Sequence, residues 1–363
     1  MFSKYYSLSA ILKKDANYNI IIGERSNGKT YASLKYGLEQ YVKEGREIAY
    51  IRRWKEDIRG KRATQIFAAI VADGLVAKLT KGEYTTINYY SGRFFLANYD
   101  ENLKKFVNAP EPFCYGFALT DMEHDKSVSF PKVGTIIFDE FLTRRAYLPD
   151  EFVLFMNTIS TIVRHRADVK IFMLGNTVNK YCPYFKEMGL DKVAEMKQGK
   201  IDVYKYGDSP LKVAVEYCSN AIIQRKPSDV YFAFDNPKLQ MITGGKWEID
   251  LYPHLPKKYR PKDIVLNYFI EFDDNLLQCE VIDDGKDTFT YIHRKTTPIQ
   301  SEDDIVFRLV QSPRPNQIMD ITKPFNKMTK MIWKYFQLNK VFYQDNEVGE
   351  VVRNYMVQCG KMK

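Results

Sequence analysis

The sequence is poor in the residues from which metal centres and disulfide frameworks are built. Its 363 residues include five cysteines, none in a C-x-x-C pair, and four histidines, none in H-x-x-x-H spacing. We therefore expect reduced thiols and no zinc ribbon or histidine metal site. No apolar run approaches the length of a membrane span, and the first residues lack the apolar region of a signal peptide. The sequence thus predicts a soluble intracellular protein without membrane contact.

Positive charge is in excess. Lysine and arginine number 54 against 45 acidic residues, which gives a formal net charge of +9. A basic chain often meets a polyanion, so the balance favours a nucleic-acid partner without establishing one. Hydrophobic residues at 45% and charged residues at 27% are ordinary for a globular protein. The length is enough for two domains.

A glycine loop near the N-terminus is the first motif with a specific chemistry. Residues 23–30 match G-x-x-x-x-G-K-T, between a β-branched run at 18–22 and helical apolar spacing at 30–42. Backbone N–H groups of such a loop surround nucleotide phosphates. The predicted nucleotide-binding residues are Gly23, Glu24, Arg25, Ser26, Asn27, Gly28, Lys29 and Thr30. Lys29 is expected to reach the terminal phosphates, and the Thr30 hydroxyl to hold Mg²⁺.

Two adjacent carboxylates follow a second apolar strand. Residues 135–140 read T-I-I-F-D-E, the Walker B pattern, and their apolar run is typical of a buried parallel strand. Asp139 is expected to complete the Mg²⁺ shell, and Glu140 to act as general base toward water. A guanine-reading N-K-x-D is missing, because residues 179–182 read N-K-Y-C. We therefore expect ATP hydrolysis.

A third strand, at residues 167–177, ends in Gly-Asn-Thr. Asn176 is a candidate sensor of the γ-phosphate, although a turn-forming asparagine explains it nearly as well. Arg164 lies between a predicted helix at 151–164 and this strand, at the sheet end away from Asn176. It is therefore either a surface arginine or an arginine finger that serves a neighbouring subunit's nucleotide.

A basic segment follows the predicted strand at residues 46–53. Six of residues 52–62 are lysine or arginine, and one is tryptophan. Contact with a phosphodiester backbone and a solvated helix start both explain it. Near the C-terminus, strands are predicted at 264–272, 277–282 and 288–292, and helices at 323–338 and 346–358.

Four aspartates, Asp273, Asp274, Asp283 and Asp284, lie between these C-terminal strands and invite a two-metal nuclease hypothesis. Turn chemistry explains them better, because they stand in D-D-N and D-D-G turns. A nuclease would also need an acid within the first of these strands. We therefore expect no nuclease activity.

In their order and spacing, these motifs resemble the DNA-packaging ATPase (encapsidation protein) family of phi29-like tailed phages. The resemblance covers the first 200 residues, and the remainder matches only loosely, in the order of its strands and helices. It rests on Ile22–Thr30, Tyr50–Lys55, Thr135–Phe141, Val163–Arg166, Leu174–Asn176 and Cys182–Phe185.

The resemblance implies an α/β fold in two parts. Residues 1–200 would form a P-loop NTPase of the ASCE type with a parallel central sheet, and residues 201–235 a linker or lid. Residues 236–363 would form a smaller α+β domain, RNase H-like and nuclease-inactive, that binds DNA or the portal.

The implied function is an ATP-driven motor that moves viral double-stranded DNA into a procapsid. Such motors form homomeric rings, by resemblance a pentamer, on the portal (connector) protein, here in the host cytoplasm and transiently at the procapsid vertex. A structural packaging RNA is a further candidate partner. The rival hypotheses are a DNA-binding regulatory ATPase, such as a helicase loader or partition protein, and a non-enzymatic portal adaptor with a relic P-loop.

The resemblance also assigns roles to single residues. Glu140 is the catalytic base, Arg164 the arginine acting in trans, and Lys126 a second basic residue acting between subunits. Lys55 falls where the family approaches DNA, and Arg59 and Lys61 share its basic segment. Arg25 matches an arginine in the P-loop of related motors. The Gly-Asn-Thr context of Asn176 departs from the family's usual Ser-Asn.

Overall fold

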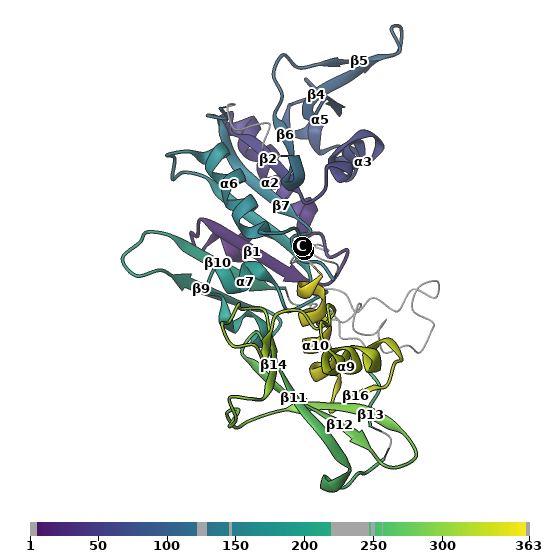
Figure 1. The fold of residues 1–363 in the computed structure, drawn as a ribbon. Coiled ribbons are helices and arrows are strands. Elements are labelled where there is room, and N and C mark those ends of the chain that lie inside the picture. The colour runs from purple at the N-terminus through teal and green to yellow at the C-terminus, as the bar shows by residue number, and fades with distance from the viewer. Residues whose placement is uncertain are drawn as a thin grey trace. The chain divides into compact units, whose positions relative to one another are not determined.

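The chain divides into two compact units, which are described separately. The structure is a computed structural model that describes residues 6–121, 129–144, 147–218, 247, 251–255 and 257–360. The first unit comprises residues 1–144 and 150–248, and the second comprises residues 145–149 and 249–363. Figure 1 shows the strands and helices of both units. Among the described residues, none of the helices is long and apolar enough to cross a membrane.

A large, mostly parallel sheet organises the first unit. Six neighbouring strands are parallel, in the order β6 (Cys114–Ala118), β2 (Glu47–Arg52), β7 (Val133–Asp139), β8 (Lys170–Asn176), β1 (Tyr18–Gly23) and β10 (Lys212–Tyr217). Antiparallel strands extend both edges: β9 (Lys200–Lys205) beside β10, and β4 (Arg93–Asp100), β3 (Thr86–Tyr90) and β5 (Lys105–Asn108) beyond β6. The predicted parallel sheet is therefore present, within a mixed one.

Helices cover both faces of the central strands, which explains why β1 and β7 are buried along their whole length. On one face, Tyr36 of α2 (Lys29–Glu44) meets Phe172 of β8, with ring centroids 5.3 Å apart. On the other face, Phe155 of α6 (Glu151–Val163) stacks on Phe138 of β7 at 5.0 Å. The shorter helices of this unit are α1 (Ser9–Leu12), η1 (Lys55–Ile58), α3 (Gly60–Gln65), α4 (Ala68–Ala72), α5 (Leu75–Leu79), α7 (Pro183–Glu187) and η3 (Asp191–Glu195).

The carboxyl ends of the central strands meet at one edge of the sheet. Gly23 at the end of β1 pairs in register with Asn176 at the end of β8, and Asp139 at the end of β7 pairs with Leu174. Strand β2 ends at Arg52 beside β7. Ligands of open α/β sheets bind at such an edge, so the topology alone brings the predicted motifs together.

The sheet continues past residue 200, where the sequence placed the end of the first domain. Strands β9 and β10 lie in residues 200–217, and β10 pairs in parallel with β1. Val213, Ala214 and Val215 of β10 are fully buried. Local pattern indicates such strands, but the sheet that they join depends on contacts with residues about 200 positions earlier.

The second unit contains a six-stranded sheet. Its order is β15 (Gln317–Ile318), β14 (Ile305–Arg308), β11 (Ile264–Phe272), β12 (Asn275–Asp283), β13 (Thr288–Arg294) and β16 (Val341–Tyr343). Strands β11 to β13 form the predicted antiparallel meander, while β14 is parallel to β11 and β16 to β13. A short η4 (Pro261–Asp263) precedes β11, and the two predicted C-terminal helices are α9 (Lys327–Gln337) and α10 (Asn346–Cys359).

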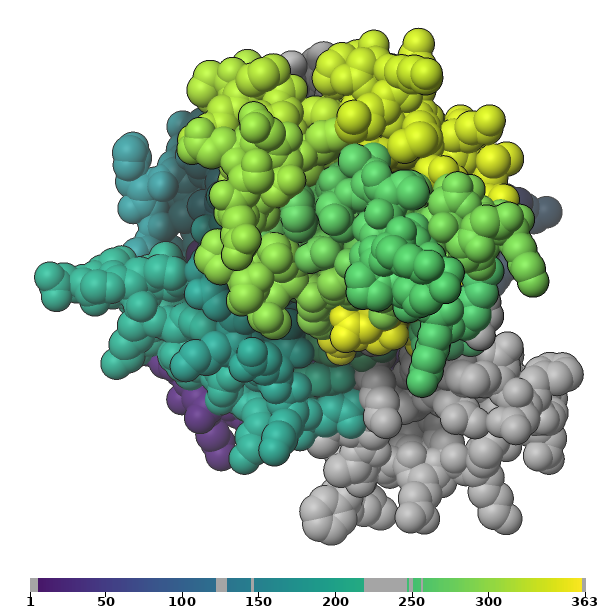
Figure 2. Space-filling view, turned by 60° about the horizontal axis from the view of Figure 1, so that its bottom comes forward, coloured from purple at the N-terminus to yellow at the C-terminus, as the bar shows by residue number. Residues whose placement is uncertain are grey.

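Packing of α10 against this sheet forms the core of the second unit. Tyr268, Cys279 and Ile292 from the strands and Val348 and Tyr355 from α10 are all fully buried. In Figure 1 both helices lie on one side of the sheet, and Figure 2, turned by 60° so that the bottom of Figure 1 comes forward, shows residues of the strands (green) at the surface. The second unit is thus a sheet with its helices on one face.

Candidate nucleotide site

Glycines allow the loop between β1 and α2 to close tightly. Gly28, directly before the first residue of α2, has a φ of 95°, which favours glycine, and Ser26 has a φ of 59°. At Gly23 a Cβ atom would lie 3.0 Å from the Cβ of Cys218, so the end of β1 has little room for a side chain. Glycine is therefore favoured at both of these positions of the motif, at Gly28 by the backbone conformation and at Gly23 by the lack of space.

The Lys29 ammonium lies buried inside the loop and is held by three oxygens. Its Nζ donates to the Glu24 carbonyl at 2.6 Å, to Asn27 Oδ1 at 3.2 Å and to Asn176 Oδ1 at 3.3 Å. Burial lowers the pKa of Lys29, although the neighbouring Cys218, Asp139 and Glu24 oppose the shift. A desolvated cation ringed by oxygens is a suitable partner for a phosphate.

Thr30 and Asp139 form a pair of oxygen ligands beside this cation. The Thr30 hydroxyl lies 3.2 and 3.3 Å from the two Asp139 carboxylate oxygens. The Tyr50 hydroxyl also donates to Asp139, at 2.7 Å, and burial followed by the Asp139 charge raises the pKa of Tyr50, which keeps it a neutral donor. Hydroxyl and carboxylate oxygens are the ligands that Mg²⁺ takes in proteins, so this donor set fits the predicted ion.

Glu140 lies next to Asp139 in an unusual backbone conformation. Its φ is 58°, and its N–H donates to Asp139 Oδ1 at 3.0 Å. The side chain is more than half exposed, and its carboxylate lies 2.6 Å from the Arg52 guanidinium. In this conformation one carboxylate oxygen of the predicted base is therefore engaged in an ion pair with Arg52.

Arg52 connects the two carboxylates and was not among the predicted site residues. A second guanidinium nitrogen of Arg52 lies 3.5 Å from Asp139. Burial disfavours the charged form of Arg52, but Tyr50, Glu140 and Asp139 together outweigh that effect, and the pKa of Arg52 is raised. The sequence shows a strand that ends in two arginines, but it does not show that this strand lies beside the Walker B strand.

Arg53 likewise does not contribute its charge to the surface of the basic segment at 52–62. It is buried, and its Nε donates to the Glu151 carboxylate at 2.8 Å. Of the two explanations left open for residues 52–62, contact with a phosphodiester backbone and a solvated helix start, neither describes these first two arginines. Their side chains serve the carboxylate site and the interior, because β2 is a central strand whose end faces the site.

The remaining basic residues follow on η1 and α3. Lys55 forms an ion pair with Asp121 and is partly buried, whereas Arg59 is exposed, 3.8 Å from the same carboxylate. Lys61 is exposed on α3, and Trp54 leaves 44% of its surface open. The structure thus places all three DNA-binding candidates in one segment that follows β2, on the edge of the sheet that carries the P-loop.

The other predicted residues are distributed over both edges of the sheet. Asn176 belongs to the site through its contact with Lys29, and no side chain fits at Gly175, where a Cβ would lie 2.8 Å from Leu142. Arg25 is exposed on the loop. Arg164 is exposed where α6 ends, with a φ of 52°, and precedes β8, whose first residue lies roughly 20 Å from Asn176 at the other end of the strand. Lys126 lies outside the described residues.

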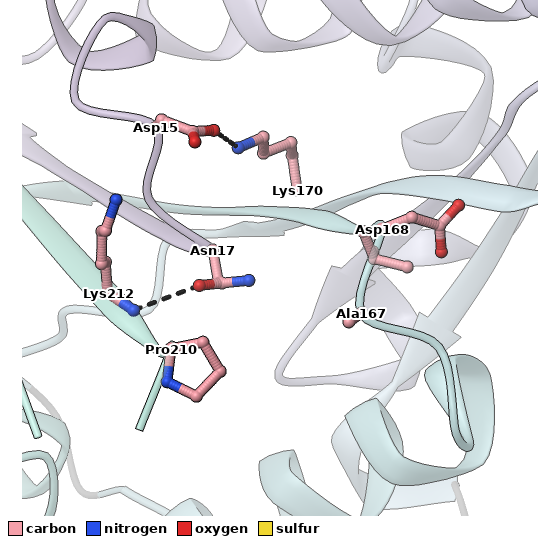
Figure 3. Close-up of a pocket in the computed structure, with 8 residues that line it drawn as sticks. Asp15, Asn17, Ala167, Asp168, Lys170, Pro210 and Lys212 are labelled. Carbon is pink, nitrogen blue, oxygen red and sulfur yellow. Dashed lines mark hydrogen bonds and ion pairs between the residues drawn. The ribbon is translucent and has the colours of Figure 1, made fainter. Parts of the chain in front are cut away.

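A polar cavity of about 240 Å³ lies at the amino ends of β1, β8 and β10, away from the P-loop edge (Figure 3). Asp15 and Lys170 form an ion pair there at 2.7 Å, and Asn17 accepts the Lys212 backbone N–H at 3.1 Å. Its lining residues are Asp15, Asn17, Ala167, Asp168, Val169, Lys170, Pro210 and Lys212. The candidate nucleotide site does not include this cavity.

In the part of the chain that the structure describes, no cluster of three histidine, cysteine or acidic residues could hold a metal ion.

Comparisons with known proteins cover the first unit by sequence and both units by fold. The family model of the podovirus DNA encapsidation protein (Gp16) matches residues 2–206. The DNA packaging protein of Bacillus phage phi29 is 28% identical over 187 residues, which are 50% of this chain and 49% of that protein. That of Bacillus phage B103 is 29% identical over 183 residues, 50% of each. The chain thus matches about half the length of these curated relatives.

Two solved structures resemble the whole chain. A chain of the Phi-28 gp11 DNA packaging motor aligns with a TM-score of 0.54 at 17% identity, over 98% of each chain. A chain of the bacteriophage Phi-29 viral genome packaging motor assembly aligns with a TM-score of 0.58 at 20% identity, over 99% of this chain and 100% of that one. At these identities the likeness shows a shared fold.

The lowered pKa of Lys29 predicts a pH limit for binding of a nucleoside triphosphate. Phosphate binds the protonated amine, so affinity is retained below the folded-state pKa and lost above it, by about tenfold per pH unit. Because burial lowers that pKa, the decline should begin below the ordinary lysine value of 10.5. Titration of nucleotide affinity against pH, with exposed Lys35→Met as the control, measures this limit. An affinity that stays flat up to pH 10.5 in a folded protein contradicts it.

Proposed function

The chain belongs to the podovirus DNA encapsidation protein (Gp16) family, and from this premise we propose that it is an ATP-driven motor that moves viral double-stranded DNA into a procapsid. One observation carries the proposal. Lys29, Thr30, Asp139 and Glu140, which come from motifs about 110 residues apart, meet at one edge of the sheet with Thr30 hydrogen-bonded to Asp139. An intact constellation of this kind supports hydrolysis and weighs against a relic P-loop in a passive adaptor.

ATP and Mg²⁺ are the proposed ligands. The loop Gly23–Thr30 would surround the β- and γ-phosphates through backbone N–H groups, with the Lys29 ammonium exchanging its loop oxygens for phosphate oxygens. Thr30 and Asp139 would hold Mg²⁺, whose charge stabilises the phosphates. Asn176, which already contacts Lys29, is placed to respond to the γ-phosphate.

Hydrolysis needs a water aligned with the γ-phosphate and a group that accepts its proton. Glu140 is the proposed base, because it stands at the rim of the site and its side chain is more than half exposed to water. Tyr50 and Arg52 orient Asp139 from the side of β2.

The proposed assembly is a homomeric ring, by resemblance a pentamer. It would bind a portal protein in the host cytoplasm. Arg164 supports it, because the residue is exposed at the sheet edge opposite the P-loop, where it cannot reach its own nucleotide. We propose that it stabilises transition-state charge on a neighbour's ATP, with Lys126 as a second group between subunits. Lys55, Arg59 and Lys61 would contact the DNA backbone. A packaging RNA remains a candidate partner.

The finer fold assignments are proposals with topological support. In the first unit β8 separates the P-loop strand β1 from the Walker B strand β7, as expected of an ASCE-type NTPase. In the second, the order β13-β12-β11-β14-β15, with β14 and β15 parallel to β11, supports an RNase H-like domain. We retain the functional division into an ATPase domain and a DNA- or portal-binding domain, and assign β9 and β10 to the first because they belong to its sheet.

The second unit is proposed to lack nuclease activity. The first strand of its sheet does carry an acid, Glu271, contrary to the reasoning from sequence, but this carboxylate accepts a hydrogen bond from Arg308 of β14 at 2.8 Å. An arginine paired with the acid disfavours metal binding there. Asp283 and Asp284 accept backbone N–H groups of their own turn, which supports a structural role.

The central test measures ATP hydrolysis, its stimulation by DNA and packaging into purified procapsids. Glu140→Gln should lower turnover roughly 100- to 10,000-fold while ATP binding persists, because only the base is lost. Glu39→Gln, an exposed glutamate on α2, serves as the control. Stimulation by DNA without packaging would favour the regulatory ATPase, and absence of hydrolysis would favour the adaptor.

Arg59→Ala with Lys61→Ala should reduce the stimulation by DNA.

The trans role of Arg164 predicts complementation between two inactive variants. Arg164→Ala should lower turnover by roughly 10³-fold or more, and Lys29→Ala should abolish it. In mixed rings, an Arg164→Ala subunit keeps an intact Lys29, and a neighbouring Lys29→Ala subunit supplies the intact Arg164. Mixing should therefore restore part of the activity. Arg164→Ala mixed with the Lys29→Ala/Arg164→Ala double variant is the matched control and should stay inactive. No recovery at any mixing ratio removes the trans role.

For the second unit we expect that the pure protein does not nick supercoiled plasmid in Mg²⁺ or Mn²⁺. The reason is the pairing of Glu271 with Arg308, which leaves the first strand without a free metal-binding acid. Gel analysis of plasmid topology measures it, with a metal-dependent nuclease as the positive control. Nicking that depends on the metal and co-purifies with the chain would overturn this assignment.

A further inference from the structure

A buried network of three side chains lies beneath the Walker B strand. The Arg53 guanidinium forks onto the Glu151 carboxylate, with Nε and Nη2 each 2.8 Å from a carboxylate oxygen. The Tyr184 hydroxyl donates to the same carboxylate at 2.9 Å. Exposure is 6% for Arg53, 2% for Glu151 and none for Tyr184. The three residues come from the end of β2, the first turn of α6 and α7.

The same guanidinium holds the main chain of the proposed base. Arg53 Nη1 donates to the Glu140 carbonyl at 3.2 Å, and Nη2 donates to the Phe141 carbonyl at 2.7 Å. Glu140 has a φ of 58°, a left-handed conformation that a side chain with a Cβ disfavours and that persists only where its surroundings enforce it. The two bonds from Arg53 act on the peptide groups that define this turn.

Stability alone does not account for such a pair. A buried ion pair loses hydration, and well-packed apolar residues of similar volume are often at least as stabilising. The aromatic packing around it already ties the same elements together, because Tyr184 contacts Phe138, Phe141 and Phe155 at ring distances of 5.6 to 5.8 Å. What the pair adds is a fixed orientation, because the planar guanidinium of Arg53 donates its hydrogen bonds at fixed angles.

We propose that Arg53 and Glu151 are positioning residues that hold Glu140 in its left-handed turn and so aim its carboxylate toward the nucleotide site. Glu151 orients the guanidinium, and the guanidinium orients the two carbonyls. Neither residue touches the nucleotide, because both are buried below the strand end. The inference rests on the proposed function, in which Glu140 is the base.

The test replaces all three side chains of the network with apolar groups, so that none of the three remains as a buried charge or hydroxyl without the other two. The triple variant Arg53→Met/Glu151→Leu/Tyr184→Phe should remain folded with unchanged ATP affinity, and with a Tm at or slightly below that of the wild type, because the Glu140 and Phe141 carbonyls lose their donor. Its kcat should fall roughly 10- to 100-fold, because the base is no longer held in line. The matched control is Asp15→Asn/Lys170→Met, which removes an ion pair from the opposite edge of the sheet (Figure 3) and should leave kcat unchanged.

A double-mutant cycle separates positioning from general structural damage. In the Glu140→Gln background the triple variant should cause no further loss of residual turnover, measured in single-turnover reactions, because its effect passes through Glu140. A further loss there, or a folded triple variant with wild-type kcat, overturns the inference. If the triple variant does not fold, Arg53→Lys decides. It keeps the charge but loses the fork, and it must show the same fall in kcat.

The outcomes also distinguish this inference from the proposed function. If the wild-type chain binds ATP but does not hydrolyse it, and Glu140→Gln changes nothing, the proposed function fails and the positioning role fails with it. If the wild-type chain hydrolyses ATP and depends on Glu140, but the folded triple variant is unaffected, only the positioning role is lost.

Discussion

Burial of β7 between β2 and β8 is the constraint on which the site depends. The strand is enclosed by helices on both faces and paired on both edges, so its last residue can lie only at the common carboxyl edge of the sheet. That placement brings Asp139 to the Thr30 hydroxyl and to Tyr50. The carboxylate therefore gains its partners from β2, from the residue that follows β7 and from the start of α2, and apolar packing of the strands supplies the energy that holds it there.

The site shows how a packed core specifies polar geometry. Lys29 is desolvated yet held by three oxygens, Arg52 links two carboxylates, and Arg53 with Glu151 ties the interior to the turn at Glu140. Each buried charge has an oxygen or nitrogen partner, as burial requires. The rigid strands hold the loop residues at this edge in position, and catalytic groups need to be held in this way.

Much of the fold and the predicted centre of the site could be read from local patterns. The strands ending at Gly23 and Asp139, the helix after the loop and the meander of the second unit occur at or close to the predicted residues. Asn176 joins Lys29, as its place at a strand end suggested. Arg52 and Arg53 were counted in the basic segment at 52–62, because a charge pattern does not show which way the side chains point. Glu151 gave no signal, and Tyr50 gave none for its contact with Asp139, since single polar residues in apolar elements have no distinctive spacing.

By itself, the sequence determined the class of chemistry, because the loop G-x-x-x-x-G-K-T and the Asp139-Glu140 pair depend on contiguous residues whose backbone path is local. It also determined the order of the elements. Only the tertiary structure decided which strands are neighbours, that the first sheet continues through β10, and that Arg52 and Arg53 turn inward while Arg59 and Lys61 stay exposed. The physical reason is that strand pairing and burial arise from contacts between residues far apart in the chain, and local periodicity contains no information about those partners.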